Sequence, residues 1–418
     1  DIIGFSIMTG LHDWAIAVSQ KVKGKIDVYS VFGGPHSTFF PELIENDGVD
    51  CVCLGESENS LIEIADILSK GEVPKNVRGA WFKINGNIYK NESAMLVENL
   101  EKLPYPDRLL YQSRYPSLAK SQAVFLAGRG CPFQCTFCFN HSLIKLYKGK
   151  GKYVRFRPVA DLINEIKDVM KNQRVKTIYF QDDTFILQKK WIKEFCATYK
   201  KEIGLPFICL IRADLIDEET IQCLKEANCK TVFWGIESGV ERTRNILLKK
   251  RLTDEQIYKC AQLLKKYKIR FRTYNILGFP GETLEEAFQT VNINVKIKTD
   301  YPWCSIFQPL PKTELAEYSK KMGVLDEGTM LTSPSFFNDS PLKMRNKNEM
   351  INLQKLFFYA VKFPFLHPLI RVAIKLKPNP VYKLLFLAGY AWCYCFSELV
   401  PLKELLIIGK MNTKRLFT

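Results

Sequence analysis

The sequence has few cysteines for a disulfide-stabilised protein and shows no secretory hydrophobic region at its start. Its 418 residues include 13 cysteines, a density far below that of small disulfide-rich domains. We therefore expect a cytoplasmic protein in a reducing compartment. Some of its cysteines are then candidates for metal ligation.

Internal repeats, low-complexity tracts and long hydrophobic runs are also lacking. The 47% hydrophobic and 25% charged residues exclude a largely disordered chain. An uncharged stretch over residues 384–397 is 14 residues long, whereas a membrane-spanning helix needs about 20. The length predicts roughly two to four domains.

The basic excess is not spread along the chain. Residues 341–418 hold 13 Lys and Arg against 3 Asp and Glu, so +10 of the net charge of +16 lies there. The first 340 residues are close to neutral for their size, which argues against a nucleic-acid-binding core. We expect a small-molecule or lipid-like substrate, no nucleic acid, and a separate role for the basic tail.

Residues 1–75 alternate strands and helices as a doubly wound α/β domain does. The predicted strands are 2–8, 28–32 and 50–55, and the predicted helices are 14–22, 41–46 and 56–68. Gly33 and Gly34 follow the second strand, at the edge where such sheets bind ligands. Because no element precedes the first strand, we expect that one or two N-terminal strands are missing; a small complete domain is the alternative.

Residues 76–120 are predicted to be a connector, because turn signals lie at 85–87 and 104–107. In residues 121–330, strands again alternate with amphipathic helices. The strands are predicted at 122–127, 175–181, 206–211, 230–235, 269–277 and 303–308, and the helices at 159–171, 189–200, 217–227, 254–267 and 282–297. Six such units indicate a partial (β/α) barrel with its site at the carboxyl ends of the strands. Residues 331–418 are predicted to be a mainly helical tail.

Three cysteines share a glycine-rich loop directly after the first barrel strand. Cys131, Cys135 and Cys138 have a CxxxCxxC spacing, and thiolates are the usual ligands of iron–sulfur clusters. Three ligands leave one iron of a four-iron cluster open to a substrate or cofactor. The alternative is a structural zinc site completed by His141.

This spacing, with Phe137 before the last cysteine, resembles the radical S-adenosylmethionine (SAM) superfamily over roughly residues 121–308. The resemblance implies that the three cysteines hold a 4Fe–4S cluster whose open iron binds SAM. Reduction then cleaves SAM to a 5′-deoxyadenosyl radical, with an electron donor such as flavodoxin or ferredoxin. The backbone of Phe137 matches the position that contacts the adenine.

Residues at successive strand ends match further SAM contacts of that superfamily. By this resemblance, Asp182 or Asp183 meets the SAM amino group, and the Asp-Asp-Thr sequence leaves open which acid does so. Arg212 would pair with the SAM carboxylate, a group that suits its bidentate fork. Glu237, followed by Ser238, fits a ribose hydroxyl.

Gly278 ends the fifth strand and would let the backbone approach the adenine closely. Each of these residues also has a structural interpretation. The paired acids would cap the next helix, Arg212 and Glu237 would form a salt bridge, and Gly278 would belong to an ordinary turn. Residues 155–157 (Arg-Phe-Arg) are interpreted as solvated basic surface rather than as a site for a substrate anion.

The segments GGPHST (33–38) and GESENS (55–60) extend the resemblance to cobalamin-binding radical SAM enzymes of the class B methyltransferase type. It implies that the corrinoid lies against Gly33 and Gly34 and faces the barrel mouth. The cobalt-ligating loop Asp-x-His-x-x-Gly does not occur in this sequence. Either it lies in a missing segment or the cobalt has no His ligand; His36 is interpreted as a turn residue.

The expected activity is cobalamin-dependent methylation of an unactivated carbon. One alternative is a non-methylating radical SAM enzyme that catalyses a cyclisation or rearrangement, with or without cobalamin. Another is a non-catalytic iron–sulfur electron carrier. The strand-end motifs argue against the carrier, which has no need of nucleoside-sized contacts.

The tail combines aromatic residues with cations. The uncharged stretch 384–397 contains Phe386, Tyr390, Trp392, Tyr394 and Phe396. The cations around it are Lys362, Arg371, Lys375, Lys377, Lys383, Lys403 and Lys410. This composition suits an interfacial helix on anionic lipid and therefore peripheral membrane contact. The other interpretation is a helical cap over the barrel mouth, with its apolar face buried against the catalytic domain, and the two can coexist.

Overall fold

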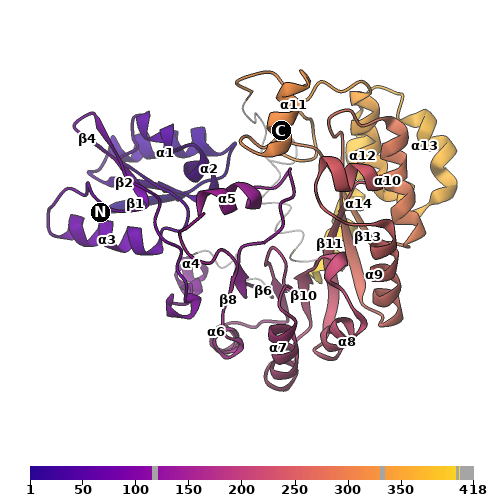
Figure 1. Cartoon of the computed structure of the whole chain (residues 1–418), viewed down its shortest axis with the longest axis horizontal. Coiled ribbons are helices and arrows are strands. Elements are labelled where there is room, and N and C mark those ends of the chain that lie inside the picture. The colour runs from indigo at the N-terminus through magenta and orange to yellow at the C-terminus, as the bar shows by residue number, and fades with distance from the viewer. Residues whose placement is uncertain (115–120, 330–334, 402–403, 405–418) are drawn as a thin grey trace.

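The computed structural model describes residues 1–114, 121–329, 335–401 and 404. It shows an α/β protein with an N-terminal mixed sheet, a larger parallel sheet and a helical C-terminal region, so the predicted fold class is confirmed. In Figure 1 the N-terminal domain, in indigo, lies on one side of the larger sheet. The last helices of the C-terminal region, in yellow, lie on the other side.

The N-terminal sheet is parallel over its first three strands and ends in an antiparallel hairpin. Its strands follow the order β1 (Ile2–Ser6), β2 (Tyr29–Gly33), β3 (Cys51–Cys53), β4 (Ala80–Ile84) and β5 (Asn87–Lys90). Its helices are α1 (His12–Lys23), α2 (Gly34–Phe39) and α3 (Glu58–Ser69). The two alternating βα steps predicted for this segment are therefore present.

The structure differs from the prediction at three places in this domain. Residues 34–39 form α2, and the helix predicted at 41–46 is a 3-10 turn, Pro41–Glu45. The predicted connector contains β4 and β5, which extend the N-terminal sheet to Lys90. Asn85 and Gly86 join them with φ of 49° and 80°, as a two-residue type I′ hairpin requires. These strands are too short for a clear sequence pattern.

The larger sheet consists of six parallel strands, as predicted. They follow the order β13 (Tyr301–Ile306), β12 (Arg270–Leu277), β11 (Cys229–Glu237), β10 (Phe207–Leu210), β9 (Thr177–Phe180) and β6 (Gln122–Phe125). The crossover helices are α6 (Val159–Asn172), α7 (Lys189–Glu202), α8 (Glu218–Glu226), α9 (Asp254–Lys266) and α10 (Leu284–Lys296). Four of them bury their apolar faces with the outer face of the sheet in one core, which also contains Cys196, Cys209, Cys229 and Cys260.

The C-terminal region covers the β13 edge of this sheet. Its helices are α11 (Glu314–Lys321), α12 (Lys347–Lys362), α13 (His367–Ala373) and α14 (Pro380–Glu398). α12 packs against β13, α10 and α14. The cap was expected over the barrel mouth, but α14 instead ends beside Gln122 and Arg272, near the amino ends of β6 and β12. Among the described residues, no helix has both the length and the hydropathy that a membrane crossing requires.

Arg272 fastens α14 to the inner face of the sheet. Its neighbour Phe271 belongs to the outer core, so Arg272 points to the opposite face. The guanidinium lies over the rings of Phe233 and Trp303, at 4.2 and 4.4 Å from their centroids. It also donates to the carboxylate of Glu398 at 2.9 Å. A buried ion pair thus joins the end of α14 to the sheet.

Replacing Arg272 by Ala should lower the free energy of unfolding by about 3–5 kcal/mol, because Glu398 would stay buried without its cation. Urea denaturation measures this loss. Arg371→Ala is the control, because its ion pair with Glu285 is exposed and should contribute at most about 1 kcal/mol. Equal losses in the two variants would contradict the account.

Candidate functional site

The cysteine loop begins at the carboxyl end of β6 and leads into α5 (Asn140–Leu146). Its start is held in a two-stranded ladder of β7 (Gly128–Arg129) and β8 (Arg155–Phe156). Gly130 has φ +87°, and a Cβ there would lie 2.4 Å from the carbonyl oxygen of Tyr153. A side chain at this position would therefore clash with the backbone of Tyr153 and displace the loop from the β7–β8 ladder.

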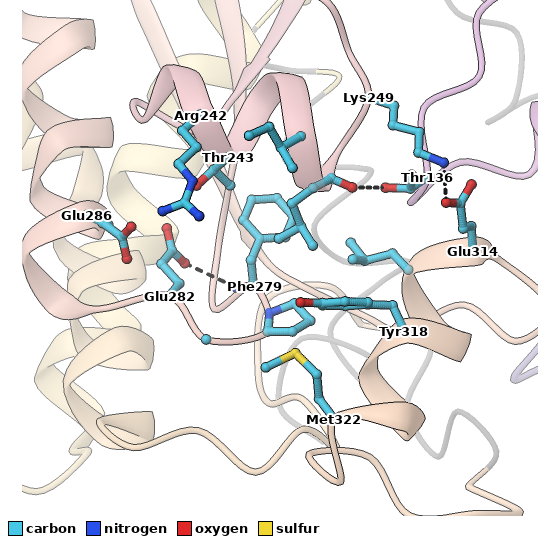
Figure 2. Close-up of a pocket in the computed structure, with 15 residues that line it drawn as sticks. Thr136, Arg242, Thr243, Lys249, Phe279, Glu282, Glu286, Glu314, Tyr318 and Met322 are labelled. Atoms are coloured by element: carbon cyan, nitrogen blue, oxygen red, sulfur yellow. Dashed lines mark hydrogen bonds and ion pairs between the residues drawn. The ribbon is translucent and has the colours of Figure 1, made fainter.

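Thr136, between the first and last cysteines of the loop, anchors it to the barrel. Its hydroxyl donates to the Leu247 carbonyl at 2.7 Å, and its amide donates to the Leu248 carbonyl at 3.1 Å. Its own carbonyl accepts from the amide of Leu315, at the start of α11, at 3.0 Å. Figure 2 shows Thr136 at one end of a pocket that Phe279 and Tyr318 also line. The loop is thus held from two sides.

The three thiols lie among groups that suit a bound cluster. The side-chain amide of Asn140 is 3.6 Å from Sγ of Cys138, and Nη1 of Arg212 is 3.8 Å from Sγ of Cys135. Burial raises the pKa of the Cys131 thiol, and it raises the pKa of Cys138 to about 11. N–H donors toward sulfur stabilise the thiolates that iron requires.

The zinc alternative gains no support from the geometry. Nδ1 of His141 is 2.6 Å from the carbonyl oxygen of Cys138, and Nε2 is 3.3 Å from the Ser142 hydroxyl. Within the described ranges, no three His, Cys, Asp or Glu side chains converge as ligands of a single ion. A four-iron cluster needs its thiolates spread around it, each on its own iron, and the chemistry of this donor set fits that group.

The structure separates the two adjacent acids. Asp182 is buried, and its carboxylate accepts from the amides of Ala127 at 3.0 Å and Gly128 at 2.7 Å. Burial raises the pKa of Asp182 to about 7. The Asp183 side chain is exposed and lines a cavity beside the cysteine loop. Asp182 therefore binds the loop backbone, whereas Asp183 faces the cavity and interacts with the side-chain amide of Asn140.

Arg212 contacts the cluster loop but already has a carboxylate partner. Its guanidinium stacks at 3.5 Å over the ring of Phe133 and makes two 3.0 Å hydrogen bonds to Asp214. A third hydrogen bond, of 2.8 Å, reaches the Lys250 carbonyl. The guanidinium is thus already hydrogen-bonded within the protein. Its carboxylate partner is Asp214 and not Glu237, with which a salt bridge was the structural alternative.

Glu237 ends β11 in a left-handed conformation, with φ +70°, which a non-glycine residue adopts only where the surroundings hold it. Its carboxylate pairs with Nζ of Lys250 at 2.8 Å, and both side chains are buried. A Cβ on Gly235 would lie 1.9 Å from that carboxylate. Lys250 was missed from the sequence, where it lies in an ordinary basic run.

Ser238 and Gly278 shape the backbone at the ends of β11 and β12. The Ser238 carbonyl accepts from the buried Arg244 at 2.8 Å. Gly278 has φ +83°, and its amide and that of Phe279 donate to Glu282. Phe137 packs in the same apolar cluster as Phe279. The predicted adenine-side residues thus share one edge of the sheet.

A cavity of about 480 Å³ separates the two domains at this edge. One wall carries Gly34, Thr38 and Gly55 at the carboxyl edge of the N-terminal sheet. The opposite wall is formed by the cysteine loop and Asp183. Gly34 has φ +90°, and a Cβ there would lie 2.7 Å from the amide nitrogen of Ile7. Gly33, also predicted to contact the corrinoid, lies in β2 and pairs with Ser6 of β1. It is not among the residues that line the cavity.

Ion pairs across the domain boundary set the width of this cavity. Arg155 is buried and pairs with Glu56, so it is not solvated basic surface. Arg129 bridges to Glu56 at 3.2 Å and to Glu58 at 2.6 Å. A Cβ on Gly55 would lie 1.7 Å from the hydroxyl oxygen of Tyr147. Sequence reasoning missed these pairs, because nothing local connects residues so far apart in the chain.

His36 lies in α2, where its ring stacks on His12 at 4.1 Å and on Phe40 at 4.9 Å. Its Nδ1 is 3.1 Å from the Thr9 hydroxyl. Burial lowers the pKa of His36 to about 4. The ring is thus a packed, neutral side chain within the domain. Its role is structural, but it lies in a helix and not in the predicted turn.

Comparison with known proteins matches residues 125–292 to the radical SAM superfamily model. An uncharacterized methyltransferase of Pyrococcus horikoshii is 32% identical over 324 residues, which cover 76% of this chain and 69% of that protein. The chain belongs to the radical SAM superfamily.

Two other similarities are broader. The anaerobic magnesium-protoporphyrin IX monomethyl ester cyclase of Rubrivivax gelatinosus is 24% identical, over 79% of this chain and 64% of that protein. The structure of the cobalamin-dependent radical SAM enzyme OxsB, with aqua-cobalamin bound, aligns with a TM-score of 0.66 at 17% identity. That alignment covers 99% of this chain and 67% of OxsB, and it shows that the two share a fold. As a radical SAM enzyme, the protein uses a 4Fe–4S cluster and SAM.

Glu282 should make the stability of this radical SAM enzyme depend on pH. Burial raises its pKa to about 8, so the folded state holds a proton that the unfolded chain releases. The free energy of unfolding should therefore fall as the pH rises from the ordinary carboxyl range to about 8. Glu282→Gln keeps an oxygen for the Gly278 and Phe279 amides and should flatten that dependence.

Thermal unfolding across this pH range measures the effect. Asp182 contributes in the same direction, because its pKa is raised to about 7, so some dependence should remain. The control is Glu255→Gln, at an exposed position on α9, which should follow the wild type. A Glu282→Gln profile as steep as that of the wild type would contradict the assignment.

Proposed function

We propose that this protein is a cobalamin-dependent radical SAM methyltransferase that acts on an unactivated carbon. The observation that carries the proposal is the cavity between the N-terminal sheet edge and the cysteine loop. A corrinoid held there would lie between the domain that binds it and the loop that holds the cluster. The shared fold with OxsB and the similarity to a methyltransferase support this proposal.

In this proposal, Cys131, Cys135 and Cys138 ligate the cluster, and the cluster supplies the electron that cleaves SAM. A one-electron donor of the flavodoxin or ferredoxin type supplies that electron. Arg212 lies against the thiol of Cys135, and Asp214 already accepts two of its hydrogen bonds. Arg212 therefore donates toward a cluster thiolate and does not pair with the SAM carboxylate. Asp182 positions the loop through its backbone.

In this proposal, the contacts to SAM come from Asp183, Glu237 and the backbone at Gly278. Asp183 is exposed beside the cysteine loop and would receive the SAM ammonium. Glu237, held by Lys250, keeps a second carboxylate oxygen for a ribose hydroxyl. The left-handed turn at Gly278 presents backbone to the adenine, next to Phe137. Each contact comes from a different strand end, as a nucleoside lying across the sheet edge requires.

Cobalamin would supply the methyl group to the substrate carbon. Gly34 and Gly55 leave the sheet edge free of side chains, and a Cβ at either would collide with protein atoms. Thr38 joins these two turns: its hydroxyl donates to the Gly34 carbonyl and accepts from the Gly55 amide, both at 2.9 Å. Phe39 and Phe139 stack across the domain boundary at 4.8 Å. This cradle of bare backbone beside aromatic rings fits a flat ligand.

The second candidate is a radical SAM enzyme that does not transfer methyl groups. The similarity to a cyclase of Rubrivivax gelatinosus favours it. The cluster, SAM contacts and domain-boundary cavity would serve such a reaction equally well. The two candidates differ in products, because methyl transfer converts SAM to S-adenosylhomocysteine and a cyclisation does not.

Anaerobically reconstituted protein should form 5′-deoxyadenosine from SAM and dithionite. Addition of methylcobalamin should permit S-adenosylhomocysteine formation as well. Cys135→Ala should abolish both products, because it removes a cluster ligand. The matched control is Cys223→Ala on α8, which should retain both. Deoxyadenosine without S-adenosylhomocysteine in any cobalamin condition would favour the non-methylating candidate. A verified cluster with neither product would contradict both.

The cavity can be tested by filling it. Leu126 lines the cavity and is half exposed, so Leu126→Trp should obstruct it and weaken retention of hydroxocobalamin about tenfold. Visible absorbance after gel filtration measures the retained corrinoid, and iron and sulfide content should stay unchanged. The control is Leu110→Trp, at an exposed position on α4 (Arg108–Arg114) outside the cavity. Wild-type retention by Leu126→Trp would contradict this placement of cobalamin.

A further inference from the structure

The C-terminal region exposes an apolar stripe around α13. Phe365, Leu369, Val372 and Leu376 are between 58% and 77% exposed. Leu369 and Val372 lie three residues apart on α13, so they share one face of that helix. Phe365 lies in the 3-10 turn just before α13, and Leu376 lies just after it. Isolated exposed apolar residues are ordinary, whereas a continuous row marks an interaction surface. In Figure 1, α13 lies at the edge of the molecule, on the side away from the N-terminal domain.

α14 carries a second stripe on the face that it turns away from the barrel. Its inner face is buried at Tyr382, Gly389, Cys393 and Ser397. Its outer face exposes Val381, Leu384, Trp392 and Phe396, each between 46% and 68%. The sequence left open an interfacial helix, a cap, or both. In the structure, one face of α14 packs against the sheet, and the opposite face exposes apolar side chains.

The two stripes meet where α13 passes into α14. Leu376 and Val381 are five residues apart, and the hydroxyl of Tyr382 donates to the Ala373 carbonyl at 2.7 Å. A groove of about 730 Å³ opens beside this junction, lined by Leu384, Leu387 and Pro378. We call the two stripes together the C-terminal apolar surface.

The charges that the chain between α12 and the end of α14 contributes to this surface have one sign. Between Glu349 and Glu398 the chain contains six Lys and Arg and no Asp or Glu. Lys362, Arg371, Lys375 and Lys377 are exposed on or beside α13, and Arg371 pairs with Glu285 of α10. The cations Lys403 and Lys410 lie outside the described residues. Apolar side chains bordered by cations match the boundary between the headgroups and acyl chains of an anionic membrane.

We propose that the C-terminal apolar surface docks this enzyme on an anionic lipid bilayer, with α13 and the outer face of α14 in the interfacial layer. A lipid surface fits better than a second copy of this chain, because two such surfaces would bring like charges together. This proposal is independent of the reaction proposed above.

Co-sedimentation with vesicles of phosphatidylcholine, with and without phosphatidylglycerol, tests the docking. The wild type should bind only the vesicles that contain phosphatidylglycerol and should dissociate at high salt. The variants Leu369→Glu/Val372→Glu and Leu384→Glu/Trp392→Glu should each weaken binding about tenfold or more, because they place carboxylates in the interface. Point variants are preferred to deletion, because α12 within this region is largely buried.

The control is Ile62→Glu/Val73→Glu, which changes two side chains of the N-terminal domain that are 60% and 62% exposed. It should bind as the wild type does. Thermal unfolding identifies any variant that fails to fold, and light scattering reports self-association. The proposal is overturned if the wild type does not bind anionic vesicles at low salt. It is also overturned if the control loses as much binding as the variants of the C-terminal apolar surface. A dimer that the same variants dissociate, without vesicle binding, would also overturn it.

Discussion

The site depends on one buried carboxylate. Asp182 lies just after β9 and accepts hydrogen bonds from the amides of Ala127 and Gly128, where the chain leaves the neighbouring strand β6. This contact turns the chain across the sheet edge and so determines where the three cysteines lie. The same turn leaves Asp183 facing the cysteine loop. A neutral or charged Asp182 can accept both amides, so the anchor persists although burial raises its pKa to about 7.

Around this anchor, long-range pairs fix the remaining groups. Arg212 reaches from β10 to Asp214, to Cys135 and to the backbone of Lys250, whose side chain holds Glu237. Contacts from β10 and β11 are thereby linked to the cysteine loop. On the other side, Arg129 and Arg155 join the loop to the N-terminal domain through Glu56 and Glu58. The cluster loop is therefore also a point of contact between the two domains, and several of the paired residues line the cavity there.

Much of this could be predicted from the sequence, because the informative signals are local. Alternating strands and helices predict the parallel sheet, and the CxxxCxxC spacing identifies the loop. The partners of Arg212 and Glu237 could not be predicted, because Asp214 and Lys250 lie among many similar charged residues. The local sequence pattern also does not predict which face of α14 is buried, because residues 384–397 are uncharged and mostly apolar on every side of the helix. Only packing against the barrel distinguishes its buried face from its exposed one.

In the proposed function, the cysteine loop carries a cluster with an open iron, and SAM binds that iron beside Asp183. Electron paramagnetic resonance of the reduced, reconstituted protein tests it most directly. SAM should shift the cluster signal of the wild type, and Asp183→Asn should require more SAM for the same shift. A fully loaded cluster whose signal does not respond to saturating SAM would contradict the account.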